Sequence, residues 1–162
     1  RLTRETLSDW IGSGIKSAGP IIIITGAGAA FGGVLKATQI GENLGQVLSE
    51  YNLGIFLPFI IAAALKTAQG SSTVALVTAS ALVAPLLPGL GLESDLGRTL
   101  AVMAVGAGAM TVSHANDSYF WVVSQFSKMD VATSYKTFSI ATLVQGVVTV
   151  AVIYVLYLFL PL

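Results

Sequence analysis

The segment 111-TVSHANDSYFW-121 interrupts a part of the chain that is otherwise strongly apolar. Five of the six residues from Ser113 to Ser118 are polar, and they include the single histidine, His114, and an aspartate, Asp117. The flanking residues read LAVMAVGAGAM and YFWVVSQF. An ionisable side chain at the centre of a bilayer costs about 3 kcal/mol even on the lenient insertion scale. If this segment lies in a membrane, His114 and Asp117 are candidate functional residues.

The composition of the whole chain favours a membrane protein. The chain has 162 residues, of which 54% are hydrophobic and 10% are charged, and its mean hydropathy is +0.82. A soluble domain carries about 25% charged residues, so much of this surface is not expected to face water. The net charge of zero removes the basic excess that nucleic-acid binding needs, and the absence of cysteine excludes disulfides and thiolate metal sites. We expect no cofactor and no metal ion.

The two ends of the chain each predict a membrane crossing. Residues 1–16, RLTRETLSDWIGSGIK, are amphipathic and lack the apolar core of a signal peptide, and the chain has no initiator Met, so we expect a piece of a longer protein. This amphipathic segment is expected to lead into a transmembrane helix over residues 17–38, in which a glycine cluster indicates close packing or a local break. A second span is expected over residues 137–160, since about 20 apolar residues cross a bilayer. Tyr154 and Tyr157 are plausible interfacial anchors of this span.

The middle of the chain contains two interrupted apolar stretches. Residues 54–66 and 73–88 are each short for a crossing, and TAQGSST between them is rich in turn and capping residues. Residues 54–88 therefore form either a re-entrant hairpin or one interrupted span, and residues 97–127, broken at SHANDS, raise the same choice. We favour a re-entrant hairpin followed by a broken transmembrane helix. The basic residues then share the cytoplasmic side, opposite the loops 39–53 and 89–98, as the positive-inside rule requires: Arg1, Arg4, Lys16, Lys128 and Lys136.

Both interruptions are expected to line one central cavity, because backbone leaves helical geometry at membrane depth only inside protein or beside water. A new helix N-terminus offers free N–H groups and a partial positive charge to an anion. Two such ends suit a small polar anion, as in secondary transporters. The expected caps are Ser71, Ser72 or Thr73 after the first interruption and Asn116, Asp117 or Ser118 after the second. The predicted substrate-binding residues are Gln69, Gly70, Ser71, Ser72, Thr73, Ser113, His114, Asn116, Asp117 and Ser118.

His114 and Asp117 are also the candidates for carrying a coupling proton. They are three residues apart, which is close enough for their side chains to interact if helical geometry persists between them. Histidine titrates near physiological pH, and a buried aspartate can titrate in the same range. The residues alone do not decide between the two.

Simpler interpretations apply to several other polar residues. Lys36 and Lys66 either line a pathway or extend their ammonium groups to the membrane interface, and we favour the second. Thr142 is expected to bond to a helix carbonyl or to hold helices together, as are Thr78 and Ser80. The QGSST run alone is almost as consistent with a simple turn as with a binding site.

Three segments of the chain resemble the C-terminal part of the gluconate permease family of bacterial symporters: 21-IIIITGAGAAFGGVLKATQIG-41, 67-TAQGSSTVALVTASALVAP-85 and 106-GAGAMTVSHANDSYFWVVSQF-126. The most specific pattern is SHxNDSxFW, met here by Ser113, His114, Asn116, Asp117, Ser118, Phe120 and Trp121. The likeness covers essentially the whole chain.

The resemblance implies a multi-pass protein of the bacterial inner membrane that imports gluconate, or a related sugar acid or hydroxy acid, together with protons. It implies an all-α ion-transporter fold in which this chain is the second inverted repeat, with a re-entrant hairpin and a broken transmembrane helix. Such a repeat is expected to pair with an N-terminal repeat of the same permease and to work in a homodimer.

The leading hypothesis is a solute–proton symporter, not an enzyme. An intramembrane serine hydrolase is less favoured, because Ser, His and Asp packed within six residues leave no separate base and oxyanion hole, and no nucleophile-elbow pattern is present. A channel or an assembly subunit without its own substrate is the other alternative, which passive and non-saturable uptake would favour. The residues leave open which acid is carried and whether protons or sodium drive it.

Overall fold

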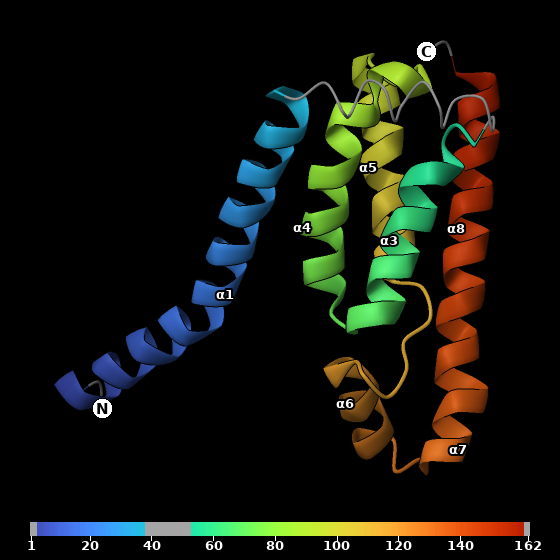
Figure 1. Ribbon diagram of the computed structural model, residues 1–162. Coiled ribbons are helices and arrows are strands. Elements are labelled where there is room, and N and C mark those ends of the chain that lie inside the picture. The colour runs from blue at the N-terminus through green and yellow to red at the C-terminus, as the bar shows by residue number, and fades with distance from the viewer. Residues whose placement is uncertain (1–2, 38–52, 161–162) are drawn as a thin grey trace.

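The computed structural model describes residues 3–37 and 53–160, with part of the side chains in the first helix left out (Figure 1). Within these ranges the chain is helical and contains no strand, so the predicted all-α class is confirmed. Arg1, residues 39–52 of the predicted loop and the side chain of Lys36 lie outside what is described. The elements are α1 (Arg4–Ala37), α3 (Phe56–Gln69), α4 (Ser72–Val83), η1 (Ala84–Leu86), η2 (Pro88–Leu90), α5 (Asp95–Ala109), α6 (Ser118–Phe126), α7 (Val131–Ser134), η3 (Tyr135–Ser139) and α8 (Ile140–Phe159).

The last three elements form one continuous helix from Val131 to Phe159, with a π-helical turn at η3. Asp130 caps its first turn, because the carboxylate accepts a hydrogen bond from the backbone N–H of Thr133 at 2.6 Å. This hydrogen bond holds the pKa of Asp130 below its usual range. Among the described residues, this helix alone is long and apolar enough to cross a bilayer. The helix begins before residue 137, the predicted start of the span. Lys136, the charged residue just before the charge-free interval, is exposed and does not interrupt the helix.

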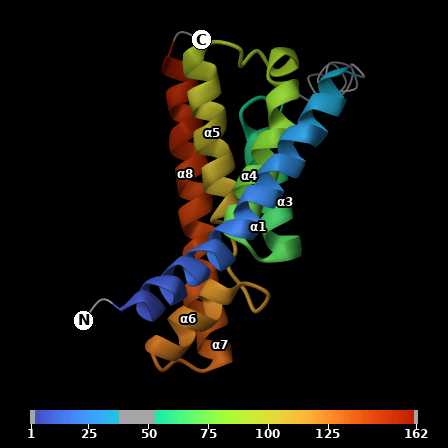
Figure 2. The ribbon, with the colours of Figure 1, turned by 90° about the vertical axis from the view of Figure 1, so that its left-hand side faces the viewer.

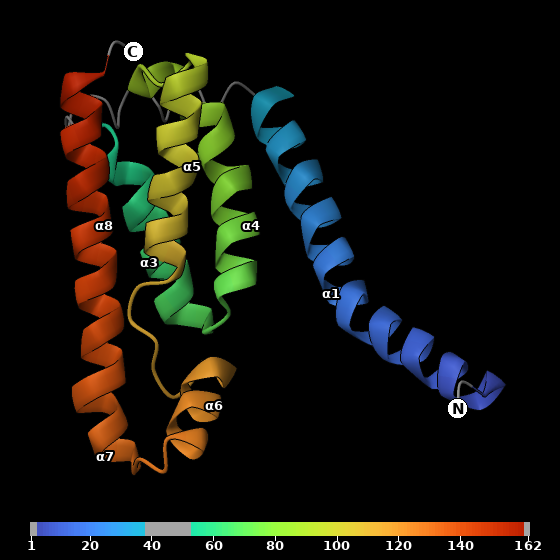
Figure 3. The same cartoon turned by 180° about the vertical axis from the view of Figure 1, so that it is seen from behind.

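Helices α3 and α4 run in opposite directions and are joined by only two residues, Gly70 and Ser71. Gly70 ends α3 in a left-handed conformation, with φ of 84°, and its N–H donates to the carbonyl of Lys66 at 2.8 Å. Ser71 caps α4, because its hydroxyl accepts from the N–H of Val74 at 3.3 Å. The two outer ends of this helical hairpin lie at the same end of the molecule, and its tip lies beside the chain that follows α5 (Figures 1 and 3).

Helix α5 packs against α3, α4 and α8 at the centre of the bundle. Gly108 allows the close approach of α3, because a Cβ atom added there would lie 2.3 Å from the carbonyl oxygen of Phe59. Small residues at helix contacts are typical of helices that associate in lipid. The buried residues that fill the interface with α3 and α4 include Ala62, Ala75, Ala79, Val83, Val105 and Ala109.

Helix α1 lies to one side of this bundle. Its C-terminal half runs beside α4, and its N-terminal half diverges from the other helices (Figures 2 and 3). The amphipathic segment 1–16 and the predicted span 17–38 therefore belong to one helix over the part of them that is described.

Candidate functional site

Residues 110–117 connect α5 to α6 without forming a helix, and they pass beside the tip of the α3–α4 hairpin (Figure 1). The polar run SHANDS thus coincides with the place where the helix stops and restarts. Val112 in this connection has a φ of 50°. A β-branched residue rarely adopts this conformation, and such backbone strain concentrates at functional sites. We refer to residues 110–117 as the break.

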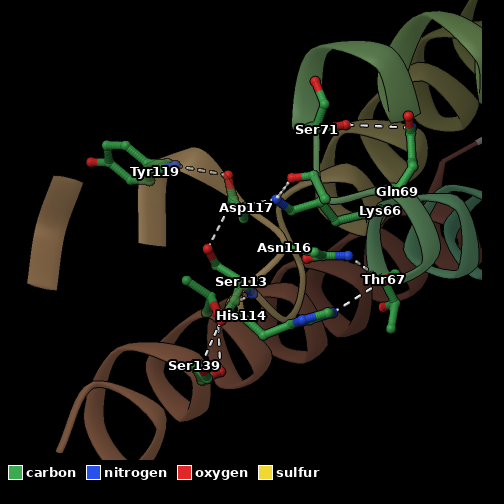
Figure 4. A network of polar contacts seen from close by, with 12 residues as sticks. Lys66, Thr67, Gln69, Ser71, Ser113, His114, Asn116, Asp117, Tyr119 and Ser139 are labelled. Carbon is green, nitrogen blue, oxygen red and sulfur yellow. Dashed lines mark hydrogen bonds and ion pairs between the residues drawn. The ribbon is translucent and has the colours of Figure 1, made fainter. Parts of the chain in front are cut away.

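A buried ion pair joins the break to the hairpin. The ammonium of Lys66, near the end of α3, lies 2.5 Å from Oδ2 of Asp117 (Figure 4). The side chains of Lys66 and Asp117 are only 1% and 6% exposed. Two charges withdrawn from water to this extent are costly unless they are paired and hydrogen-bonded. Such a pair within an apolar chain is a strong candidate for function.

Asp117 has two further donors, and they connect it to the fold. Its Oδ1 accepts from the backbone N–H of Tyr119 at 2.9 Å, which makes Asp117 the N-cap of α6. Its Oδ2 also accepts from the hydroxyl of Ser113. The first turn of α6 therefore already faces a carboxylate of the chain itself. Of the two helix N-termini that were expected to bind an anion, the N-terminus of α6 is already capped by Asp117.

Lys66 does not extend to an interface, so the favoured interpretation of this residue is wrong. Its ammonium donates to the carbonyl oxygen of Gly70 as well as to Asp117, and the side chain is buried. Snorkelling would require a path along the helix surface to water. Here the side chain instead turns inward from α3, and its ammonium donates hydrogen bonds to one oxygen atom of the hairpin tip and one of the break.

His114 and Asn116 attach the break to the same point of α3. His114 Nε2 lies 3.0 Å from the carbonyl oxygen of Thr67, and Asn116 Nδ2 donates to that oxygen at 2.9 Å. Since a carbonyl only accepts, His114 Nε2 carries the proton in this contact. The helical geometry that would bring His114 onto Asp117 is absent, and the two side chains bond to different partners on α3.

The other side of the break is held by the last helix. The N–H of Ser113 donates to Thr142 Oγ1 at 3.0 Å, and Ser139 Oγ donates to the carbonyl of Ser113 at 2.5 Å. The N–H of Ala115 donates to the hydroxyl of Tyr135 at 3.2 Å. Side chains from η3 and α8 thus satisfy backbone groups that a helix would have satisfied. Thr142 Oγ1 also donates to the carbonyl of Ser139 at 3.0 Å, so the expectation that Thr142 bonds to a helix carbonyl or holds helices together is confirmed in its first form.

Gly70 allows the hairpin tip to touch the break directly. A Cβ atom at this position would lie 2.2 Å from the carbonyl oxygen of Asn116. Real Cβ atoms do not approach backbone so closely, and the left-handed φ of Gly70 adds a second requirement for glycine. The contact of the two non-helical segments therefore depends on one residue without a side chain.

The structure divides the predicted substrate-binding residues into two groups. Gly70, Ser113 and Asp117 are buried at the contact, and Ser71 and His114 are half-buried beside it. The remaining five are exposed or half-buried around it: Gln69, Ser72, Thr73, Asn116 and Ser118. Lys66, Thr67, Tyr135 and Ser139 were missed as site residues. A lysine near the polar TAQGSST run was a signal for Lys66, whereas the other three are visible only from the packing.

The site offers one cation, one carboxylate and several hydroxyl and amide groups. In the described ranges, no three His, Asp or Glu side chains are placed to hold a metal ion. Groups of these types suit a small polar anion with hydroxyl groups.

Comparison with known proteins gives consistent matches. A family model described as GntP family permease matches residues 1–159. A D-serine transporter of Escherichia coli K12 is 35% identical over 140 residues, which cover 86% of this chain and 31% of the relative. A gluconate permease of Pseudomonas aeruginosa is 35% identical over 141 residues, with the same two shares. An inner membrane permease of E. coli K12 is 37% identical over 141 residues, 86% of this chain and 30% of the relative.

The chain spans about a third of the length of these curated relatives. No solved structure matches it.

Proposed function

Since the chain belongs to the GntP family of permeases, we propose that it is the C-terminal part of a secondary active transporter of the bacterial inner membrane. The transporter takes up gluconate, or a related sugar acid or hydroxy acid, by proton symport. The observation that carries this proposal is the buried Lys66–Asp117 pair, held where two non-helical segments meet. Buried charges in membrane helices mark substrate or ion pathways, because their cost is otherwise selected against.

The arrangement of the helices supports a re-entrant hairpin and a broken crossing. If α8 lies along the membrane normal, the chain from α5 through α6 covers the same height, and the α3–α4 hairpin begins and finishes at one end (Figure 1). The N-terminal half of α1 and the turn between α6 and α7 lie toward the other end. The basic residues of these segments are Arg4, Lys16 and Lys128, which supports a cytoplasmic location for that end.

The outer surface of the bundle supports a membrane environment. Val144, Val148 and Val155 on α8 are 54%, 55% and 50% exposed, and Phe126 at the end of α6 is 87% exposed. Large apolar side chains exposed in this number face lipid or another protein surface. In the proposed permease, lipid, an N-terminal repeat and a second copy of the permease cover these faces.

The names of the relatives support a small ligand with a carboxylate. Gluconate and D-serine, after which two of them are named, share a carboxylate and at least one hydroxyl. Around the Lys66–Asp117 pair, the hydroxyl of Ser71 and the amides of Gln69 and Asn116 provide donors and acceptors for such hydroxyls. We propose that these residues, with Ser113 and His114, form this chain's half of the substrate site.

The contacts of Ser113 and His114 do not favour a serine hydrolase. The hydroxyl of Ser113 donates to Asp117, while His114 donates to the carbonyl of Thr67. A nucleophilic serine needs a base that accepts its proton and a separate oxyanion hole. The symporter is therefore the function that these contacts support best.

Uptake by the full-length permease in proteoliposomes tests the proposal. We expect saturable uptake of radiolabelled gluconate, D-serine or another hydroxy acid under an inward proton gradient, and its loss with a protonophore. A sodium gradient without a proton gradient should not replace it. Saturable uptake that follows sodium alone would contradict proton coupling, and passive non-saturable flux would favour a channel. No uptake of any such acid would overturn the assignment.

A further inference from the structure

We propose that Lys66 binds the carboxylate of the substrate, and that Asp117 releases Lys66 for this purpose when it takes up the coupled proton. This inference rests on the proposed function and identifies how its site recognises an anion. It replaces the expectation that the free N–H groups of two helix ends are the main receptors.

The ammonium of Lys66 has an N–H group that can bond to a ligand. It carries three N–H groups, and within residues 3–37 and 53–160, as far as they are described, two acceptors bond to it, Gly70 O and Asp117 Oδ2. Figure 4 shows the ammonium between the Gly70 carbonyl and Asp117, at the point where the hairpin tip meets the break. Asn116 in the break is exposed, so we infer that a small ligand approaches the ammonium from this side of the contact when the break moves away from the hairpin tip. Asp117 is then the acceptor whose negative charge competes with the carboxylate of the ligand for the Lys66 ammonium.

The charges of the site explain why the competition depends on a proton. At rest, the positive charge of Lys66 and the negative charge of Asp117 cancel. A substrate carboxylate alone would place two anions against one cation in a site with little water, which is unfavourable. A proton bound to Oδ2 of Asp117 leaves Lys66 with the substrate as its only anion, and the total charge stays at zero. Substrate and proton therefore favour each other's binding, as linkage requires.

Protonation leaves the other contacts of Asp117 in place. Ser113 donates a hydrogen bond to Oδ2 in the charged state, and because a hydroxyl also accepts, it can accept a hydrogen bond from the O–H of a neutral Asp117. Oδ1 continues to accept from the N–H of Tyr119 and to cap α6. The break thus keeps its shape while Lys66 changes partner.

Other ionisable groups near Asp117 do not replace Lys66 as its counter-ion. In the described part of the chain, His114 on the break is directed to Thr67 of α3. The hydroxyl of Tyr135 from η3 is bonded to the N–H of Ala115, and the ring of Tyr119 packs edge-on against Phe138 at 5.8 Å. Lys66 is the charged group that bonds to the carboxylate.

Four variants of the full-length permease test the inference in proteoliposomes: Lys66→Gln, Asp117→Asn, the double variant, and Lys136→Gln as a control that removes an exposed charge. The probe is whichever of radiolabelled gluconate and D-serine the wild type transports. Two readouts are measured from pH 5 to pH 8: exchange of substrate across the membrane, and accumulation driven by a proton gradient.

We expect Asp117→Asn, which resembles the protonated state, to exchange substrate with an affinity independent of pH and to lose proton-driven accumulation. We expect Lys66→Gln to weaken affinity about 10- to 100-fold at every pH, because a charge-assisted hydrogen bond is lost. The double variant, which leaves no unpaired buried charge, should be equally weak although it reaches the membrane. Lys136→Gln should behave as the wild type.

Wild-type affinity in Lys66→Gln or in the double variant would overturn the inference, as would wild-type pH dependence in Asp117→Asn. If Lys66→Gln alone does not fold, the double variant decides. These outcomes leave the symporter itself standing, since the wild-type protein transports. Absence of saturable uptake by the wild type would instead overturn both proposals.

Discussion

At the scale of single residues, Asp117 has two structural tasks besides its proposed one. It caps α6 through the N–H of Tyr119, and it neutralises Lys66, which is otherwise an unpaired charge in the protein interior. Removing one member of a buried pair usually costs more than removing both. A loss of activity in a single variant at this site is therefore informative only beside the double variant.

Gly70 should tolerate no side chain. In Gly70→Ala, the left-handed backbone costs about 1 to 2 kcal/mol, and the collision with the Asn116 carbonyl adds about 1 to 3 kcal/mol more. We expect a lower midpoint of thermal unfolding in detergent and loss of uptake. Gly91→Ala is the matched control, because Gly91 has a φ of 68° and nothing within 4 Å of an added Cβ. Equal effects of the two substitutions would show that the contact with Asn116 is unimportant.

His114 should be a positioning residue and not the proton carrier. The amide of glutamine can donate to Thr67 O as His114 Nε2 does, and Asn116 already donates to the same oxygen. His114→Gln should therefore keep proton-driven accumulation, with uptake reduced by no more than about tenfold. If this variant exchanges substrate but no longer accumulates it, the coupling proton resides on His114.

At the scale of elements, the hairpin and the break are one structural unit. The Lys66 ammonium, the Thr67 carbonyl and the Gly70 backbone all contact the break, so α3 contributes a cation, an acceptor and a close approach. Neither segment can change its backbone without altering the other. If the site opens and closes during transport, the contacts between α3 and the break should change together.

The α3–α5 interface should be sensitive to the size of one residue. Gly108→Ala places a methyl group 2.3 Å from the Phe59 carbonyl oxygen and 2.8 Å from Ala62 Cβ. We expect it to lower stability by about 1 to 3 kcal/mol, the usual cost of overpacking. Gly106→Ala, in the same helix with nothing within 4 Å, should be neutral or stabilising by up to about 1 kcal/mol. Thermal unfolding measures both, and a stable Gly108→Ala variant would contradict the close packing.

The sequence allowed prediction of the elements better than of their contacts. Hydropathy and turn residues located the TAQGSST and SHANDS interruptions, and capping preferences named Ser71 and Asp117 among the candidates. The partner of Asp117 was missed because Lys66 lies 51 residues away along the chain. A hydropathy scale gives every lysine the same value. It therefore does not show whether a lysine side chain reaches water or a carboxylate, because that depends on helix packing. The same holds for Tyr135 and Ser139, which meet the break only in the folded chain.

At the scale of the whole molecule, the two possible membrane topologies predict different accessibility. In the re-entrant topology, Arg4 and Lys136 lie on the cytoplasmic side and Glu93 lies opposite. If residues 54–88 crossed the bilayer, Glu93 would instead share a side with Arg4, and Lys136 would lie opposite. All three side chains are exposed, and the chain contains no cysteine.

Single cysteines at these three positions should therefore separate the two topologies. We expect a membrane-impermeant maleimide, added outside intact cells, to label Glu93→Cys and to leave Arg4→Cys and Lys136→Cys unlabelled until the cells are permeabilised. Labelling of Lys136→Cys but not Glu93→Cys in intact cells would indicate that residues 54–88 span the membrane.

The π-helical turn η3 has a consequence for how the gene tolerates changes in length. A π-helical turn holds more residues than an α-helical one, so loss of a single codon within η3 could restore a regular α-helix. The residues before the turn would then keep their direction around the helix axis, because the π-helical turn already accommodates its extra residue. Loss of Lys136 would thus leave Tyr135 beside Ala115 and Ser139 and Thr142 beside Ser113, whereas loss of one residue within α8 would rotate all of them by about 100° relative to the rest of that helix. In-frame deletions at η3 are thus expected to survive selection for transport where deletions within α8 are lost.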